Sequence, residues 1–423
     1  MHKWLSASRL LVSHSFASLR QEWTKNLTFA ASIALGCIVL LIVGGYQAWI
    51  TKGLAESLIY SQYAHLQISQ KGFSQVRTSD PFSKPLDSLE SIQASIERMA
   101  REKRIPALEV MATRQYALAT AVNPANGKNS VVEVRGVNPE AERNIFLYTT
   151  GKTGSWLTDQ DHLQCQTGRI LANTLGLETG DRLIINGIDS EEYHNALNST
   201  VKVIAGSYSS DFDSMVLTLT HSDFNELFYF DQVQELALLF EEADNLEEIR
   251  MDILTALHNE GHEVDVQIWY EQADYFRQVL DYYRGFNRMI LGMAGILVFF
   301  VCMTTASLSL EERRREFGTR RALGETRRHL ALQTAVETGF VALAGFAGGL
   351  LLAGILRFLI NSTGGIPMEA APGMATSLSV YIIHNPEALR QAALVAMAVP
   401  PVALLSPLYR SLKTSIISQL SCP

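Results

Sequence analysis

The chain has 423 residues, of which 47% are hydrophobic and 18% are charged, and its formal net charge is −8. This length is too great for one ordinary domain and is enough for two or three. The acidic balance argues against nucleic acid as a ligand. Of the four cysteines, only Cys165 lies outside the apolar runs and the C-terminal tail, so no intrachain disulfide is expected in the soluble part.

The N-terminal segment, residues 1–26, is predicted to be an amphipathic helix on the cytoplasmic membrane surface. Apolar side chains recur at helical spacing from Leu5 to Trp23, and cations lie off that stripe. A plain cytoplasmic extension of the next helix is the alternative. Residues 27–50 contain no charged side chain and predict transmembrane helix 1. A cleaved signal peptide is disfavoured, because this apolar run is longer than a typical signal core.

Residues 51–288 have a globular composition in which strand-like and helix-like segments alternate. A strand-helix-strand pattern occurs twice, at 64–69, 87–103 and 109–122 and again at 235–240, 245–261 and 263–269. Two such units around an insertion predict an α+β domain with a split ferredoxin-like module. The insertion, about 124–225, is expected to form a mostly β lobe. Residues 270–288 are expected to be a stalk helix.

Three further apolar runs predict transmembrane helices, at residues 289–310, 334–360 and 390–409. The last is the weakest, because it is short and contains Pro400 and Pro401. The segment 311–330 is then a short connection, 361–389 a longer loop, and 410–423 a tail. The expected fold is an α-helical membrane protein with four transmembrane helices and a large α+β domain.

The distribution of Lys and Arg predicts the orientation of the chain. Residues 1–26, 311–330 and the tail after 409 together hold thirteen, against seven near the other ends of the spans. Basic residues favour the cytoplasmic side. Both termini are therefore expected in the cytoplasm, and the large domain in the periplasm of a bacterial inner membrane.

No arrangement of residues in the sequence indicates catalysis. The segment "TTGKTGS" imitates a phosphate-binding loop, but Phe146 stands where that motif needs glycine. His258 and His262 have the spacing of a metal pair, but Asn259 replaces the glutamate of a zinc protease. We expect no enzyme activity, cofactor or metal site on this chain.

The segment 311–330 contains seven arginines directly after an uncharged apolar run. Arg313, Arg314 and Arg315 are expected to end the span, because arginine costs about 2.5–3.5 kcal/mol at the centre of a membrane helix. Gly318 and Gly324 are natural turning points. The residues between them predict a short transverse helix with a small apolar face, a shape that fits a groove on a partner.

The sequence "EERRREFGTRRALGETRRHLALQTAVETG" resembles the segment between spans two and three of MacB/FtsX/LolC-type ABC permeases. Those permeases read E-R-x-x-E-I-G-x-x-R-A-L-G there, and Phe317 replaces the usual isoleucine. Glu337 falls where a later acidic residue is expected. The passage "GRILANTLGLETGDRLIING" in the large domain is also similar to the family's, and the layout covers the whole chain. The matching residues are Glu312, Arg313, Glu316, Gly318, Arg321, Ala322, Leu323 and Gly324.

This resemblance implies the mechanotransmission (type VII) mode of action. A dimer of cytoplasmic ATPase subunits binds ATP and Mg, and the segment 311–330 is the coupling helix that passes its motion to the periplasmic domains. A second permease copy or paralogue completes the assembly, with lipidic or lipoprotein cargo and a possible periplasmic or outer-membrane partner. The implied coupling residues are Glu316, Phe317, Gly318, Arg321, Ala322, Leu323 and Gly324.

Alternative functions stay open at this point. A permease of a tripartite drug, toxin or peptide efflux pump fits nearly as well as lipoprotein release. A regulator of cell-wall hydrolases usually has a smaller outer domain. A membrane scaffold without an ATPase would not need a transverse helix between two glycines, so the segment 311–330 argues against it.

Overall fold

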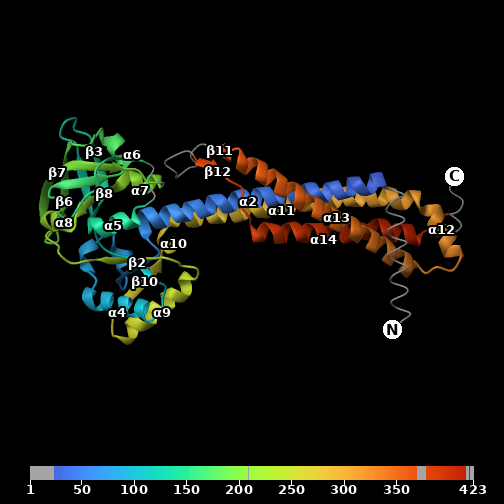
Figure 1. Ribbon diagram of the computed structural model, residues 1–423, viewed down its shortest axis with the longest axis horizontal. Helices are drawn as coiled ribbons and strands as arrows, with labels where there is room; N and C mark the ends of the chain where they lie inside the picture. Colours follow the sequence, from blue (N-terminus) through green and yellow to red (C-terminus); the bar gives the residue numbers. More distant parts are fainter. Residues whose placement is uncertain are drawn as a thin grey trace. The chain divides into compact units, whose positions relative to one another are not determined.

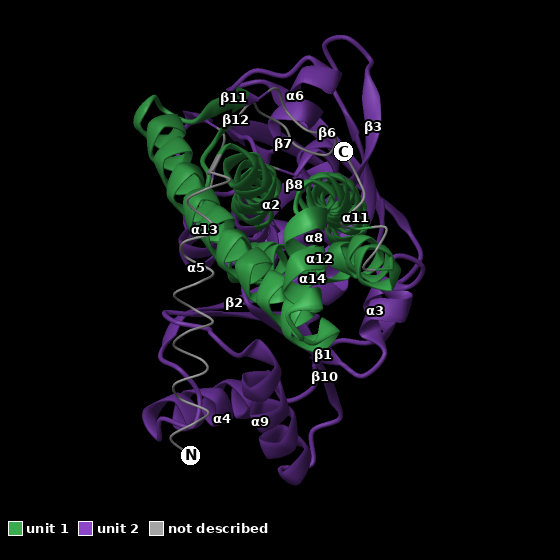
Figure 2. Ribbon diagram, turned by 90° about the vertical axis from the view of Figure 1, so that its right-hand side faces the viewer, with its two compact units in different colours: residues 1–51, 280–367, 379–423 green, residues 52–279, 368–378 purple. Residues whose placement is uncertain are grey.

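A computed structural model of the protein describes residues 23–147, 149, 151–207, 209–368, 378–415 and 419 (Figure 1). The amphipathic helix predicted for the N-terminus lies, up to residue 22, outside these residues. The described chain divides into a helical unit and a globular unit (Figure 2). The helical unit contains the described residues up to Thr51, Leu280–Pro367 and those from Ser379 onward, and the globular unit contains Lys52–Val279, Met368 and Leu378.

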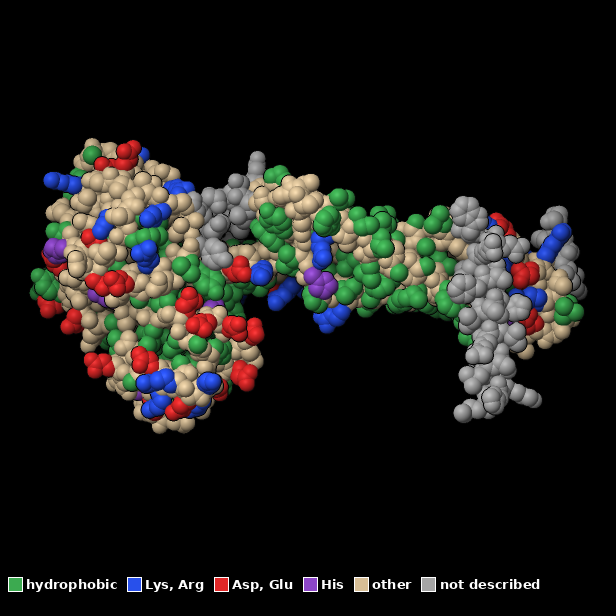
Figure 3. All heavy atoms as spheres, in the orientation of Figure 1, with side chains coloured by type: hydrophobic (Ala, Val, Ile, Leu, Met, Phe, Trp, Pro, Cys, Tyr) green, Lys and Arg blue, Asp and Glu red, His purple; other side chains and the backbone are tan. Residues whose placement is uncertain are grey.

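Four long helices form the helical unit and lie side by side in Figure 1: α2 (Trp23–Leu58), α11 (Asp274–Glu312), α13 (Arg327–Ser362) and α14 (Pro386–Lys413). Each is long and apolar enough to cross a membrane. Apolar side chains cover much of the face of this unit seen in Figure 3. Large apolar residues of the four helices are exposed, among them Phe300, Leu351 and Phe358. A surface of this kind suits hydrocarbon, so the expected class of a membrane protein with four spans is confirmed.

The helices extend beyond the apolar runs that predict them. The stalk expected at 270–288 and the span expected at 289–310 form the single helix α11. Helix α14 contains Pro400, Pro401 and Pro407 without ending. Two short strands, β11 (Ile366–Met368) and β12 (Leu378–Val380), pair within the loop between α13 and α14. Residues 369–377 of that loop lie outside the described residues.

Small residues bring α13 against α2. A Cβ added at Gly345 would lie 2.7 Å from the carbonyl oxygen of Ala30, and one added at Gly349 would lie 2.8 Å from the Cβ of Cys37. Gly348, between them, faces open space. The two glycines that touch α2 are four residues apart, the spacing at which small residues let membrane helices approach closely.

The globular unit contains the split ferredoxin-like module. Its strands are β1 (Leu66–Gln70), β2 (Leu108–Val122), β9 (Glu235–Phe240) and β10 (Val264–Ile268), and its helices are α4 (Leu89–Arg101) and α9 (Leu246–Asn259). The strands lie in the order β10-β1-β9-β2, and each neighbouring pair is antiparallel. Two crossed strand-helix-strand units in this order form the ferredoxin-like arrangement, and the expected α+β class is confirmed.

The chain between β2 and β9 continues the same sheet. Strand β2 pairs with β9 through Leu108–Arg114 and with β3 through Arg114–Val122. The inserted lobe is therefore not a separate sheet, and it includes four helices as well as strands. Its elements are β3 (Asn129–Val137), α5 (Pro139–Ile145), β4 (Lys152–Gly154), β5 (Gln164–Thr167), α6 (Arg169–Leu175), β6 (Arg182–Ile188), β7 (His194–Ala205), α7 (Ser210–Met215), β8 (Val216–Thr220) and α8 (His221–Phe228).

Short elements complete the globular unit. They are the π-helical turn η1 (Ile59–Tyr63), α3 (Phe73–Val76), η2 (Pro81–Ser83) and α10 (Trp269–Gln272). Directly after η1, His65 is buried next to β9, where its Nδ1 accepts a hydrogen bond of 3.1 Å from the backbone N–H of Phe240. Burial lowers the pKa of His65 to about 4, so the folded protein holds this imidazole neutral.

The glycine contact with α2 predicts a difference between neighbouring substitutions. Gly345→Ala or Gly349→Ala should destabilise the helical unit by about 1–3 kcal/mol, because the new methyl group meets an atom that must move. Gly348→Ala should be neutral or slightly stabilising, because alanine favours the helix. Thermal unfolding of the purified full chain in one detergent measures the difference. Equal behaviour of all three variants would show that the contact is absent.

The buried imidazole predicts a pH dependence for the globular unit. The unfolded state has an ordinary histidine pKa of about 6.5 and binds the extra proton first as pH falls. Stability should therefore fall by up to about 3 kcal/mol between pH 6.5 and 4. Urea unfolding of the full chain, followed by tryptophan fluorescence, tests this. His65→Gln should flatten the dependence, whereas His258→Gln, at an exposed site, should not.

Candidate functional site at the arginine-rich end of the helical unit

Helix α12 (Arg314–Ala322) follows α11 after a break at Arg313, whose φ of −85° and ψ of 7° are not those of a continuous α-helix. Gly318 lies inside α12 and is buried, so the prediction of a turn there is wrong. Gly324 has a φ of +96°, a left-handed conformation that glycine adopts without strain. The side chain of Thr326 then caps α13 by accepting a hydrogen bond from the N–H of His329.

One side of α12 packs into the helical unit. Phe317 is 1% exposed and forms an apolar cluster with Leu310, Leu330 and Leu404. These three residues come from α11, α13 and α14, so Phe317 joins α12 to three spans. Phe317 and Gly318 are buried within this chain, so the part in coupling predicted for them, which stays a prediction, would be to hold α12 against the spans.

The opposite side of α12 is exposed and carries an apolar end. Arg315, Thr319, Ala322 and Leu323 are exposed, and Leu323 is 84% exposed. Their spacing of four, seven and eight residues places them on one helical face, called here the α12 face. The structure thus brings together two of the predicted coupling residues, Ala322 and Leu323, on one surface.

The remaining predicted coupling residues bind within the chain. Glu316 accepts hydrogen bonds from Arg313 at 3.2 Å and from Arg320 at 3.2 Å. Arg321 donates from Nη1 to the carbonyl oxygen of Thr414 at 2.8 Å and to Oε1 of Gln419 at 3.0 Å. Arg321 therefore holds the C-terminal segment against α12.

Arg320 is a site residue that the sequence analysis did not single out. It donates to both carboxylate oxygens of Glu325, at 2.6 and 2.7 Å, and to Gln333 at 2.6 Å. These bonds connect α12, the turn at Gly324 and α13. The spacing of four residues from Glu316 to Arg320 was a signal for part of this network.

The end of α11 is attached to α13 by an ion pair. Nη1 of Arg313 lies 2.7 Å from Oε2 of Glu337, and both side chains are about nine-tenths buried. Gln333 donates to the other carboxylate oxygen of Glu337 at 3.0 Å. Arg313 was expected to act as a membrane stop with Arg314 and Arg315, and its contacts show in addition that it fixes where α12 begins.

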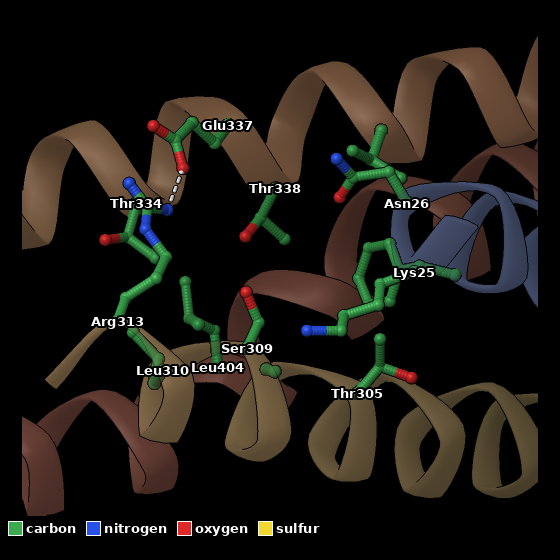
Figure 4. Close-up of a pocket in the computed structure, with 13 residues that line it drawn as sticks. Lys25, Asn26, Thr305, Ser309, Leu310, Arg313, Thr334, Glu337, Thr338 and Leu404 are labelled. Atoms are coloured by element: carbon green, nitrogen blue, oxygen red, sulfur yellow. Dashed lines mark hydrogen bonds and ion pairs between the residues drawn. The ribbon is translucent and has the colours of Figure 1, made fainter. Parts of the chain in front are cut away.

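A pocket lies beside this ion pair, between α2, α11, α13 and α14 (Figure 4). Figure 4 shows the ammonium of Lys25 and the hydroxyls of Ser309 and Thr338 directed toward the middle of the pocket. Apolar side chains also line it, among them Phe29 and Leu404. The pocket thus has cations and hydroxyl groups as well as apolar surface.

A second group of charged side chains, half-buried or buried, lies in the globular unit. It comprises Arg77, Arg114, Arg135, Glu133, Glu142 and Glu235. Burial alone would raise the pKa of Glu133, but Arg77 and Arg135 lower it to about 2. Nη1 of Arg135 also donates to the carbonyl oxygen of Gln62 at 3.4 Å. The network therefore binds η1, the turn that follows α2.

One group among the described residues has the composition of a metal site. Potential ligand atoms of His162, Asp223 and Glu226 lie within 4.8 Å of one another. Nδ1 of His162 already lies 2.6 Å from Oδ1 of Asp223. The side chains of His162 and Glu226 are exposed, whereas Asp223 is buried. His262, which the sequence analysis rejected as half of a metal pair with His258, has its Nε2 3.1 Å from Oγ of Ser91.

Comparison with known families finds one match. Residues 288–416 match the FtsX-like permease C-terminal domain, which includes α12 and most of α11, α13 and α14. A comparison with curated proteins finds no match. The resemblance to MacB/FtsX-type ABC permeases predicted from the sequence is confirmed by the family match.

Solved structures with similarity include the periplasmic region of MacB from Actinobacillus actinomycetemcomitans, with 10% identity, 51% of this chain and 92% of that chain covered, and a TM-score of 0.34. The extracellular domain of the noncanonic ABC-type transporter YknZ from Gram-positive bacteria has 11% identity and a TM-score of 0.32. The match covers 48% of this chain and 98% of that chain. TM-scores this low do not establish a shared fold with either structure.

The buried ion pair predicts unequal effects of two glutamate substitutions. Glu337→Gln removes the charge that faces Arg313 and should destabilise the helical unit by about 1–3 kcal/mol. Glu316→Gln, in a pair where the glutamate is half exposed, should cost less than about 1 kcal/mol. Thermal unfolding of the full chain compares them, and equal losses would contradict a special role for Glu337.

Proposed function

Because residues 288–416 match the FtsX-like permease C-terminal domain, we propose that this chain is an ABC transporter permease of the MacB/FtsX type, the membrane subunit through which a separate ATPase drives a periplasmic conformational change. In this proposal ATP and Mg bind to a dimer of cytoplasmic ATPase subunits, and this chain holds neither. A second permease copy or paralogue completes the complex. The termini and α12 face the cytoplasm, as the distribution of Lys and Arg indicates.

The α12 face is the observation that carries this proposal. Leu323 is 84% exposed on a helix whose other side is buried. Burying a leucine side chain is worth about 1.5–3 kcal/mol, so a groove that accepts Leu323 gains from it. Arg315, Arg327 and Arg328 are exposed close to it in sequence and would meet an acidic rim, which favours correct docking.

The contacts of α12 supply a route for motion. Phe317 and the Arg313 to Glu337 pair attach α12 to the spans, so a displacement of α12 must move α11 and α13 with it. Helix α11 is continuous for 39 residues, about 58 Å at 1.5 Å per residue. Both α2 and α11 contain residues of the two units. Motion at α12 would therefore reach the periplasmic domain through unbroken helices.

We propose a lipoprotein, a lipid or another hydrophobic molecule as the cargo. The supporting observation is that the packed interior of the four spans is apolar, with Ile33, Leu40, Val298 and Val395 among its buried residues. Such an interior does not offer water-soluble cargo a polar path. Cargo handled at the periplasmic face, without crossing between the spans, is consistent with it. Export of a drug or peptide through a tripartite assembly is the competing use of the same motion.

The double variant Ala322→Asp with Leu323→Asp tests the proposed ATPase contact. Two carboxylates on the α12 face should abolish association, because they would be buried without partners in the groove. The measurement is the amount of ATPase that co-purifies with the full-length permease. Thr326→Asp is the matched control, since it adds a charge three residues away and keeps a favourable helix cap.

Membrane insertion of the double variant should be normal, because both positions are exposed. If the double variant is inserted and retains its ATPase at the wild-type ratio, α12 is not the coupling element. Loss of the ATPase in the Thr326→Asp control as well would show that any added charge at this end is sufficient, which also contradicts a specific role for the α12 face.

A further inference from the structure

The pocket in Figure 4 is not needed for the ATPase contact and has the features of a ligand site. Its cavity volume is about 60 Å³, it is open on one side, and all its walls belong to the helical unit. A cavity of this size holds several water molecules. A small polar group could therefore enter it, while a longer ligand would extend through the opening.

Two threonine hydroxyls in this pocket have no hydrogen bond with any described residue. Threonine in a helix often donates to the carbonyl oxygen four residues earlier, and Thr304 and Thr334 do so, at 2.7 and 2.9 Å. Thr305 and Thr338 form no such bond, although both line the pocket and are only partly exposed. Neither hydroxyl is fully buried, so both remain accessible and could donate hydrogen bonds to the acceptor oxygens of a ligand.

The two cations of the pocket, Arg313 and Lys25, differ in how strongly their ion pairs hold them. Arg313 is held by Glu337 and Glu316, so its positive charge has a fixed place at the pocket. Lys25 contacts Glu312, whose side chain is 60% exposed. Exposed ion pairs contribute little, so the ammonium of Lys25 can exchange this partner for an anion in the pocket. Glu337 also lines the pocket, but Arg313 and Gln333 compensate its charge.

The position of the pocket decides the source of the anion. It is lined by residues at the beginning of the first span, Thr24–Tyr63, and at the end of the second, Phe276–Glu312. At this level hydrocarbon gives way to lipid headgroups, and basic pockets between helices there suit phosphate groups. Phe29 and Val341 supply apolar wall on the side of the spans, where acyl chains would continue.

We propose that this pocket binds the phosphate group of a membrane phospholipid. Lys25 supplies the positive charge that faces the phosphate, since the charge of Arg313 is compensated by Glu337 and Glu316, and the hydroxyls of Thr305 and Thr338 donate hydrogen bonds to its oxygens. The first carbons of the acyl chains contact Phe29 and Val341. The bound lipid would fill the space between α2, α11 and α13 next to the start of α12. This site is distinct from any periplasmic cargo site and does not depend on the proposed cargo.

The test uses the full chain, purified in detergent and titrated with phosphatidylglycerol, with bound lipid counted by native mass spectrometry. The double variant Thr305→Val with Thr338→Val keeps the side-chain shape and removes both hydroxyls. It should weaken binding at least tenfold, because two hydrogen bonds to a charged group are lost. Lys25→Gln should also weaken binding.

Thr304→Val is the matched control, since Thr304 is exposed on α11 and bonds within its own helix. It should bind phosphatidylglycerol like the wild type. Unchanged binding in the double valine variant, or an equal loss in Thr304→Val, would overturn the proposal. Size-exclusion chromatography and thermal unfolding show whether each variant is folded, and Lys25→Gln supplies an independent variant if the double valine variant is not.

Two further ligands distinguish a phospholipid from a soluble phosphate as the occupant of the pocket. Diacylglycerol, which lacks phosphate, should not displace phosphatidylglycerol. Inorganic phosphate should not displace it either at millimolar concentration, because it has no acyl chains to place against Phe29. Displacement by inorganic phosphate would assign the pocket to a soluble anion and overturn the lipid assignment, and displacement by diacylglycerol would show that the cations and hydroxyls are not used.

Discussion

The ion pair between Arg313 and Glu337 is the constraint on which the arginine-rich end of the helical unit depends. It ends α11 against α13 and thereby sets the residue at which α12 begins. With that start fixed, the helical period directs Phe317 inward and leaves Leu323 outward. An unpaired charge at this depth would be costly, so the two helices cannot separate here without a new partner for each charge.

The helical unit is stabilised mainly by close packing of apolar side chains, whereas the globular unit also contains a network of charged side chains. In the spans, Gly345 and Gly349 let α13 approach α2, and the interior between them is apolar. In the globular unit, three arginines and three glutamates form one network, of which Arg114, Arg135 and Glu235 are buried, and Arg135 donates a hydrogen bond to the backbone of Gln62 in η1. Arg135 thus binds the segment that follows α2, and Arg313 binds the end of α11. The spans themselves are held together by close packing of small and apolar residues.

The sequence predicted the spans and the ferredoxin-like module because both rest on local patterns, namely apolar runs and alternating strand and helix periods. It failed at Gly318, where glycine costs about 1 kcal/mol in a helix but burial of the adjacent Phe317 more than offsets that cost. The contact of Arg321 with Gln419 spans 98 residues and has no local signal. The pocket was equally hidden, because its lining comes from four helices that are distant in the chain.

Strand β2 runs without interruption from the ferredoxin-like module into the inserted lobe, with its two halves paired to β9 and β3. The lobe is therefore not a lid on a hinge. Because both parts share this strand, the lobe is attached to the module through one continuous sheet. In the proposed mechanism a rotation of the module would therefore carry the lobe with it, and residues of the lobe could change without altering that movement.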